Sequence, residues 1–198
     1  MIIIGLTGSI AMGKSEVAKI FSKEGIPVFD ADKEVHALYD SPEGAALIRS
    51  LIPEAIIDGK VDRTVLSKHV LENAQRLEQL ENIVHAEIAK RRVNFASQAE
   101  KQGHSIIVAD VPLLFEKSGE KQVDVTIVVS APEEQQRARA LARPGLTVKK
   151  LEAILKRQMP DAEKRRLANY VIINDGPLDA LRQNTLAVLA NIKKEHRL

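Results

Sequence analysis

The sequence predicts an α/β protein built on a five-stranded parallel sheet, and three observations support this fold class. Five short apolar segments rich in β-branched residues have the composition of fully buried strands. Helical patterns lie between them, and such alternation is typical of a parallel sheet in a three-layer α/β/α arrangement. A glycine-rich turn directly follows the first segment. The predicted strands are Ile2–Thr7, Ile26–Asp30, Ser105–Asp110, Val125–Ser130 and Tyr170–Asn174.

The glycine-rich turn at residues 8–15 reads GSIAMGKS, a full match to G-x-x-x-x-G-K-[ST]. Glycines let the backbone wrap around a phosphate, and the following helix adds its N-terminal dipole. Lys14 would reach the β- and γ-phosphates of ATP, and the Ser15 hydroxyl would bind Mg²⁺. The sequence therefore predicts a P-loop NTPase core. The expected nucleotide-binding residues are Gly8, Ala11, Met12, Gly13, Lys14, Ser15 and Glu16.

A long stretch at residues 31–104 separates the second and third predicted strands and has no good strand of its own. Apolar residues such as Leu80 and Val84 recur there at helical spacing. Pro53 and the pair Asp58–Gly59 break the stretch into pieces. We expect a helical subdomain at the C-terminal edge of the sheet, where open α/β folds bind their ligands.

Three carboxylates stand at ends of predicted strands. Asp30 and Asp32 follow the second strand; one is expected to cap the next helix, and the other could accept a proton from an attacking hydroxyl or hold a water on Mg²⁺. The residues alone do not decide between the two. Asp110 ends a buried strand in the position of a Walker-B acid, where it would serve Mg²⁺; its alternative role is a cap at the strand end.

An Arg-rich helical stretch follows the fourth strand. Most of its charges are expected on a solvated face, but Arg139 and Arg143 are four residues apart and would share one helix face. A lid with two such guanidiniums could clamp the transferred phosphoryl group, with the segment 143–147 as its bend. These features predict a single domain over residues 1–198. Its expected parts are a nucleotide core (about 1–31, 104–134 and 169–198), an acceptor-binding helical insertion (about 32–103) and a helical lid (about 135–168).

Composition narrows the function classes. Lys plus Arg number 29 against 27 Asp plus Glu, so the net charge of +2 gives no reason to expect a nucleic-acid partner. Aromatic residues are few, which disfavours base-stacking surfaces. There is no cysteine, and the five histidines have no zinc-ligand spacing. No apolar run reaches the length of a membrane span, so we expect a cytoplasmic protein without a membrane partner. The oligomeric state stays open.

Together these motifs resemble the dephospho-CoA kinases, relatives of the adenylate-kinase-like P-loop kinases. The resemblance runs in order from one end of the chain to the other. The combination of D-x-D-x₃-H with DVPLLFE is its most specific part. The matching pieces are GLTGSIAMGKS at 5–15, VFDADKEVH at 28–36, DGKVDRTVL at 58–66, LENIVHAEI at 80–88, VADVPLLFE at 108–116, Gln136, Arg139, Arg143, Gln158 and VIINDG at 171–176.

The resemblance implies the last step of coenzyme A synthesis, in which ATP phosphorylates the ribose 3′-hydroxyl of dephospho-CoA. By similarity Asp32 becomes the base, and Lys14 and Mg²⁺ neutralise the phosphates. Arg139 and Arg143 would belong to the lid. The helical insertion, with His36 and His85, would hold the acceptor. From the residues alone, His85 would instead be a packed or capping histidine.

Three positions near the phosphate loop depart from the pattern of the family. Ala11 and Met12 stand where Gly and Ser are common, and Glu16 replaces a frequent Thr and brings an acid beside Ser15.

Three other functions compete with this interpretation. A nucleoside or nucleotide kinase could share the fold. A GTPase switch is disfavoured because no N-K-x-D occurs in the sequence. A catalytically silent nucleotide-binding scaffold would bind ATP without phosphoryl transfer. Glu16 favours this alternative, because it places an acid near the anionic site.

Overall fold

The computed structural model describes residues 1–71 and 73–198, which form two compact units. One unit consists of Met1–Phe29 with Ala99–Leu198, and the other of Asp30–Gln98. Within the described residues, no helix combines the length and apolar character that a membrane span needs.

The elements in chain order are β1 (Ile2–Thr7), α1 (Lys14–Lys23), β2 (Val28–Asp30), α2 (Ala31–Tyr39), α3 (Pro42–Arg49), η1 (Pro53–Ala55), β3 (Ile56–Ile57), β4 (Lys60–Val61), α4 (Arg63–Leu71), α5 (Ala74–Lys101), β5 (Ile106–Asp110), η2 (Gly119–Gln122), β6 (Val125–Ser130), α6 (Glu133–Leu141), α7 (Val148–Leu155), α8 (Asp161–Leu167), β7 (Tyr170–Ile173) and α9 (Leu178–Glu195).

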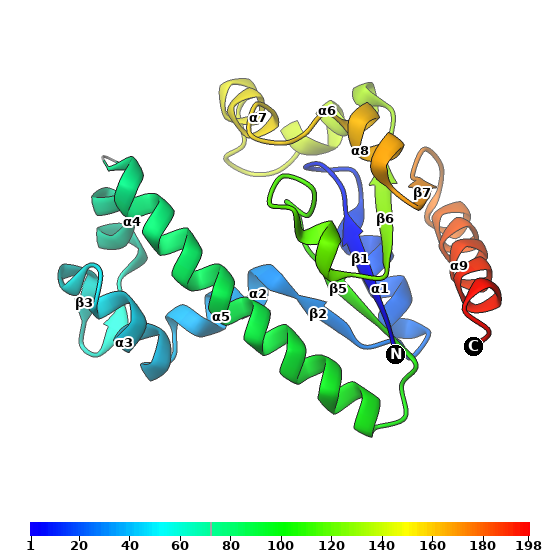
Figure 1. Cartoon of the computed structure of the whole chain (residues 1–198). Coiled ribbons are helices and arrows are strands. Elements are labelled where there is room, and N and C mark those ends of the chain that lie inside the picture. Colours follow the sequence, from blue (N-terminus) through cyan, green and yellow to red (C-terminus); the bar gives the residue numbers. More distant parts are fainter. Residues whose placement is uncertain (72) are drawn as a thin grey trace. The chain divides into compact units, whose positions relative to one another are not determined.

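The first unit is built on a five-stranded parallel sheet with the strand order β2-β5-β1-β6-β7, so the predicted fold class is confirmed (Figure 1). The P-loop strand β1 lies at the centre, between β5 and β6, in parallel register with both. The second predicted strand is shorter than expected and begins at Val28. Pro27 precedes it and lacks the N–H that a ladder position would use.

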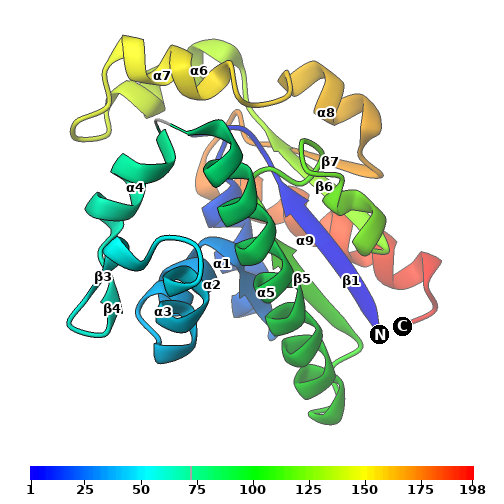
Figure 2. The same cartoon turned by 60° about the vertical axis from the view of Figure 1, so that its left-hand side comes forward.

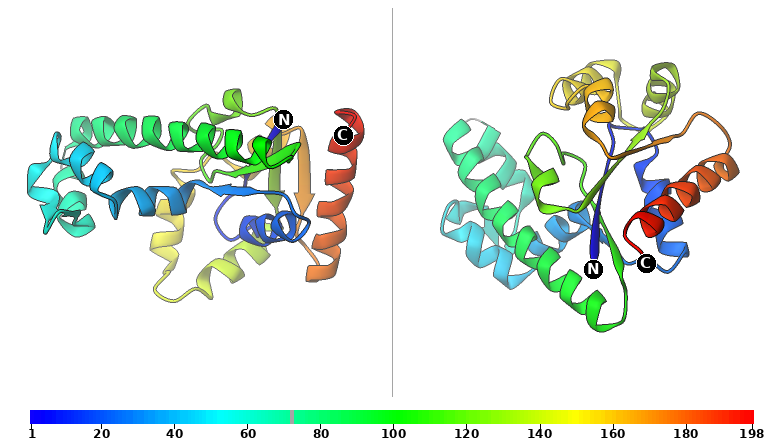
Figure 3. Two further views of the ribbon diagram at one scale, coloured as in Figure 1. Left: turned by 90° about the horizontal axis from the view of Figure 1, so that it is seen from below. Right: turned by 45° about the vertical axis from the view of Figure 1, so that its right-hand side comes forward.

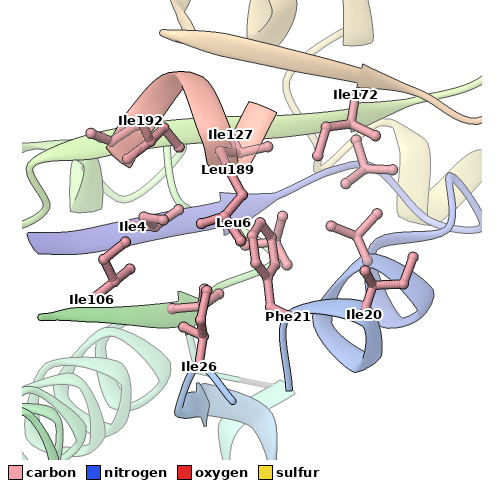
Figure 4. Close-up of a cluster of buried hydrophobic side chains, with 14 of the residues drawn as sticks. Ile4, Leu6, Ile20, Phe21, Ile26, Ile106, Ile127, Ile172, Leu189 and Ile192 are labelled. Atoms are coloured by element: carbon pink, nitrogen blue, oxygen red, sulfur yellow. The ribbon is translucent and has the colours of Figure 1, made fainter. Parts of the chain in front are cut away.

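Apolar residues of α1, α9 and the sheet form the main core. Helices α1 and α9 contact each other, and α9 runs beside β7 (Figure 3). Helix α1 contributes Val17, Ile20 and Phe21, whose spacing of three and four residues places them on one face. Figure 4 shows Phe21 and Ile20 among side chains of β1, β6 and α9. This packing fixes the first turn of α1 at the end of β1, where the glycine-rich turn lies.

The second unit has its own apolar core, which side chains of α2 to α5 and of a small hairpin form together. The hairpin lies beside α3 at the edge of this unit (Figure 2). The hairpin joins β3 and β4, two short strands within residues 31–104, where the sequence predicts no good strand. Asp58 and Gly59 form its turn, both with positive φ (49° and 77°). Asp-Gly is a strong signal for a two-residue hairpin turn, but strands of only two residues leave no alternating pattern to detect.

Helices α6, α7 and α8, with their connections, form the predicted lid stretch, and they belong to the first unit. A small apolar cluster joins Ala140 of α6 and Leu151 of α7 to the glycine-rich turn through Ala11. The segment at 142–147 is the turn between α6 and α7, and Gly145 adopts a φ of 76° there.

A largely buried ion pair anchors α8. The Lys164 side chain is completely buried, and its Nζ lies 2.8 Å from Glu116 Oε1. Glu116 Oε1 also accepts a hydrogen bond of 2.7 Å from the Met159 backbone N–H. Glu116 belongs to the DVPLLFE segment that follows Asp110, so this pair ties the end of the lid stretch to that segment.

We expect Lys164→Ala to lower the free energy of unfolding by about 3–5 kcal/mol, because it leaves the largely buried Glu116 carboxylate without the Lys164 ammonium. Lys164→Met combined with Glu116→Gln should cost clearly less, since no charge is then stranded. Urea denaturation measures both. Lys149→Ala, at an exposed position of α7, serves as the control and should stay within about 0.5 kcal/mol of the parent. An equally small effect of Lys164→Ala would contradict a structural role for the ion pair.

Candidate active site

The turn between β1 and α1 requires glycine at two positions. Gly13 caps α1 with a φ of 100°, and an added Cβ would lie 2.0 Å from Asn174 Nδ2. A Cβ on Gly8 would lie 2.6 Å from the Val129 carbonyl oxygen. Among the described residues no side chain caps the start of α1. A helix N-terminus of this kind presents N–H groups and a positive dipole to an anion.

Lys14 and Asp110 meet at the C-terminal edge of the sheet. Lys14 Nζ donates a hydrogen bond to Asp110 Oδ1, and both side chains are largely buried, with 15% and 6% of their surfaces exposed. Asp110 ends β5, which is hydrogen-bonded beside β1. The predicted phosphate-binding ammonium and the predicted Walker-B carboxylate therefore occupy one site.

The structure accommodates Ala11 and Met12, two of the three unusual residues near the loop. Ala11 adopts a φ of 61°, a left-handed conformation that costs a non-glycine residue about 1–2 kcal/mol. Its methyl group is buried against Ala140 and Leu151 of the lid stretch. The Met12 sulfur is also buried and accepts a hydrogen bond of 3.0 Å from the Ala131 N–H. Both side chains thus face protein and leave the concave side of the turn to backbone groups.

Glu16 turns away along its own helix. Its carboxylate makes an ion pair of 2.7 Å with Lys19, one turn further on. This pairing offsets the negative charge that the sequence places beside Ser15. The Ser15 side chain is exposed in the first turn of α1. Its hydroxyl and the Asp110 carboxylate are oxygen ligands of the kind that Mg²⁺ prefers, so the residues present fit this ion.

The two lid arginines differ in position. Arg139 lies on α6 and donates hydrogen bonds to the Asn174 carbonyl oxygen (3.1 Å) and to Gln135 Oε1 (2.9 Å). Helix α6 ends at Leu141, so Arg143 lies in the following turn with an exposed side chain. The expectation that both share one helix face is therefore wrong. The Pro144–Gly145 pair explains the early end, since helices usually stop before a proline.

Asp30 and Asp32 have different positions and contacts in the structure. Asp30 is the N-cap of α2, and its carboxylate accepts a hydrogen bond of 3.1 Å from the Lys33 N–H. Asp32 lies in the first turn of α2 with its side chain exposed. The capping role expected for one of the two belongs to Asp30. Asp32 is thus available for chemistry.

His36 is one helical turn beyond Asp32, so the two share a face of α2. Its Nδ1 accepts a hydrogen bond from the Arg63 guanidinium, which places the ring proton on Nε2. Arg63 also binds Asp40 at 3.2 Å and lies over the Tyr39 ring. Burial raises the pKa of Tyr39, and the nearby Arg63 lowers it in part. The hydrogen bond from Arg63 to Nδ1 therefore leaves Nε2 as the hydrogen-bond donor of the His36 ring.

Two further residues of the second unit, His85 and Asp62, belong to segments that match the dephospho-CoA kinases. His85 is exposed in the interior of α5, so the expectation of a packed or capping histidine is wrong. Asp62 accepts hydrogen bonds from the N–H groups of Thr64 (2.8 Å) and Val65 (2.9 Å). It caps α4 and so fixes the position of Arg63 next to it.

The sequence model of the family described as dephospho-CoA kinase matches residues 2–180 of the chain. The chain belongs to the dephospho-CoA kinase family. A relative from Rhodopseudomonas palustris named dephospho-CoA kinase is 47% identical over 189 residues, which is 96% of this chain and 94% of that protein. A relative of the same name from Nitrobacter winogradskyi is 47% identical over 197 residues and covers 100% of this chain and 98% of its own.

Solved structures agree with membership of the dephospho-CoA kinase family. A crystal structure from Thermus thermophilus has a TM-score of 0.83 and 36% identity, with coverage of 96% of this chain and 97% of its own. Dephospho-CoA kinase from Campylobacter jejuni has a TM-score of 0.73 and 26% identity, with 98% of both chains covered. Shikimate kinase from Acinetobacter baumannii, at 20% identity and a TM-score of 0.54, shares the fold. The family expected from the sequence is confirmed.

Three amide side chains bind the phosphate loop in the structure. The sequence places them in segments that match the dephospho-CoA kinases but assigns them no role. Gln136 donates to the Ile10 carbonyl oxygen, Gln158 accepts from the Ile10 N–H, and Asn174 donates to the Met12 carbonyl oxygen. Sequence reasoning could not assign these roles because the amides lie 126 to 162 positions away along the chain. Their place in the family motifs was the only available signal.

Proposed function

We propose that the protein transfers the γ-phosphoryl group of ATP to the ribose 3′-hydroxyl of dephospho-CoA and so forms coenzyme A and ADP. The observation that carries this proposal is the match of a dephospho-CoA kinase family model to residues 2–180 of a chain whose phosphate loop is intact. The partners are two small molecules, ATP and dephospho-CoA. We place this reaction in the cytoplasm, where ATP is available, and the lack of cysteine is compatible with that location.

On the donor side, the residues Gly8 to Ser15 bind the triphosphate. The backbone N–H groups at the start of α1 and the ammonium of Lys14 face the phosphates. Ser15 would bind Mg²⁺ directly and Asp110 would bind it through water, and the ion would neutralise charge on the β- and γ-phosphates. Lys14 already pairs with Asp110, so a small movement of its ammonium is enough to exchange that carboxylate for a phosphate oxygen.

On the acceptor side, α2 and α5 supply the residues. Asp32 is the general base, because Asp30 is committed to capping α2 while the Asp32 carboxylate is exposed. His36 presents an Nε2–H donor on the same helix face, fixed by Arg63. His85, exposed on α5, contacts the same substrate. These three residues are the proposed acceptor-binding set.

The chemical step is an in-line displacement at phosphorus. The 3′-hydroxyl gives its proton to the Asp32 carboxylate as the bond from the 3′-oxygen to the γ-phosphorus forms. The bond from that phosphorus to the β,γ-bridging oxygen breaks, and ADP leaves with the bonding electrons. Lys14, Arg139 and Arg143 stabilise the negative charge that spreads over the transferred group, which is the main task of a protein in phosphoryl transfer.

The test is ADP release by the purified protein with ATP, Mg²⁺ and a panel of acceptors. We expect turnover with dephospho-CoA and background rates with adenosine, nucleoside monophosphates and shikimate. Chelation of Mg²⁺ by EDTA should abolish turnover, and excess Mg²⁺ should restore it. GTP in place of ATP tests the GTPase alternative. Turnover with a nucleoside at the dephospho-CoA rate would overturn the proposal, and so would ATP binding without any phosphoryl transfer.

A further inference from the structure

Two glutamines bind the backbone of one residue in the phosphate loop. Gln136 Nε2 donates a hydrogen bond of 2.9 Å to the Ile10 carbonyl oxygen. Gln158 Oε1 accepts a hydrogen bond of 3.0 Å from the Ile10 N–H. Gln136 is buried on α6, and Gln158 is partly buried in the turn after α7. Both therefore extend from the lid stretch to the same peptide region.

The orientation of each amide follows from backbone chemistry. An N–H can only donate, so Gln158 must present its carbonyl oxygen, and a backbone C=O can only accept, so Gln136 must present its NH₂ group. The two glutamines thus have the same side chain but opposite roles. A carboxylate could replace one of them and not the other.

Further contacts show that this part of the loop is held by protein on several sides. Ile10 and Ala11 pack with Leu151 in the apolar cluster of the lid stretch. The Met12 carbonyl oxygen accepts a hydrogen bond of 2.9 Å from Asn174 Nδ2. Ala11, which has a positive φ, stands between Ile10 and Met12, whose carbonyl oxygens both accept side-chain hydrogen bonds. A non-glycine residue persists in that conformation only where its surroundings impose it.

We propose that Gln136 and Gln158 are positioning residues that clamp Ile10 and hold the phosphate loop in the shape that binds ATP. They act through the loop backbone and link it to the lid stretch that carries Arg139 and Arg143. This inference rests on the proposed function for its substrate, ATP. It predicts that losing either amide weakens ATP binding while the Michaelis constant for dephospho-CoA stays unchanged.

Four variants test the clamp. Gln136→Met and Gln158→Met keep the shape and remove the hydrogen bond, and each should weaken ATP binding by about 10-fold, the usual effect of leaving a partly buried polar group unpaired. Gln158→Glu keeps an acceptor for the Ile10 N–H and should bind ATP more tightly than Gln158→Met. Gln136→Glu sets a carboxylate against the Ile10 carbonyl oxygen and should bind ATP more weakly than Gln136→Met.

The two glutamate variants control for charge, because each adds one negative charge beside Ile10. Calorimetric titration with ATP should therefore show Gln136→Glu at least about 5-fold weaker than Gln158→Glu, since only one of them loses its hydrogen bond. Equal affinities of the two would overturn the clamp, as would a folded Gln136→Met with the affinity of the parent. If the Gln136 variants do not fold, the comparison of Gln158→Met with Gln158→Glu tests the clamp: Gln158→Glu must bind ATP more tightly, and an equal or weaker affinity would overturn the clamp. The titration measures ATP binding in the absence of phosphoryl transfer. A result that disproves the clamp can therefore be distinguished from one that disproves the proposed kinase activity.

Discussion

Asp32→Asn is expected to lower kcat by about 10²- to 10⁴-fold, the usual contribution of a general base. Asparagine has nearly the same shape but cannot accept the proton of the 3′-hydroxyl. The side chain is exposed in the first turn of α2, so the fold should tolerate the change. ATP affinity should stay at the level of the parent. Steady-state kinetics with dephospho-CoA and a separate ATP titration measure the two effects.

Asp30→Asn is the matched control, since it removes the same charge two residues away. Asparagine caps helices about as well as aspartate, and its amide oxygen can still accept from the Lys33 N–H. We expect kcat close to that of the parent and an unchanged melting temperature. If Asp30→Asn lost turnover while Asp32→Asn kept it, the roles of the two carboxylates would have to be exchanged.

Lys14→Met should have the second large effect, with kcat lower by about 10²- to 10³-fold, as when a charge-stabilising donor is removed from a transition state. ATP binding should weaken as well, because the ammonium binds the phosphates before and during transfer. The variant should also unfold more easily by about 3 kcal/mol, since the largely buried Asp110 carboxylate loses its ion-pair partner.

Adding Asp110→Asn to Lys14→Met separates these two effects. The double variant no longer buries the carboxylate charge that has lost the Lys14 ammonium, so most of the lost stability should return in urea denaturation. Turnover should not return, because the ammonium is still missing. A double variant as unstable as Lys14→Met would show that the Lys14–Asp110 ion pair does not contribute to the free energy of unfolding. Full activity of Lys14→Met would contradict the assignment of the loop as the phosphate site.

The sheet and the phosphate loop were predictable from the sequence because both leave strong local signals. The strands of a parallel sheet are buried on both faces, so β1, β5 and β6 appear as continuous apolar runs. The turn at 8–15 needs glycine where the backbone approaches Val129 and Asn174, and this need fixes the motif. The short hairpin of β3 and β4 was missed, because two residues per strand give no periodicity.

The candidate site was only partly predictable. Local rules anticipated that one aspartate would cap α2, but only the structure assigns this to Asp30. The end of α6 at Leu141 was missed because the charge pattern continues past it, and Arg143 therefore lost its place on the helix face. The roles of Gln136 and Gln158 depend on contacts across more than a hundred residues, for which a single sequence holds no local sign.

The most direct test of the central claim is a crystal structure with dephospho-CoA, Mg²⁺ and a non-hydrolysable ATP analogue. We predict the triphosphate on the turn at residues 8–15 with Lys14 on its terminal phosphate. The Asp32 carboxylate should lie about 2.6–3.2 Å from the ribose 3′-oxygen, the distance for proton transfer to a base. A triphosphate bound elsewhere, or a 3′-oxygen that contacts a different carboxylate, would contradict the account.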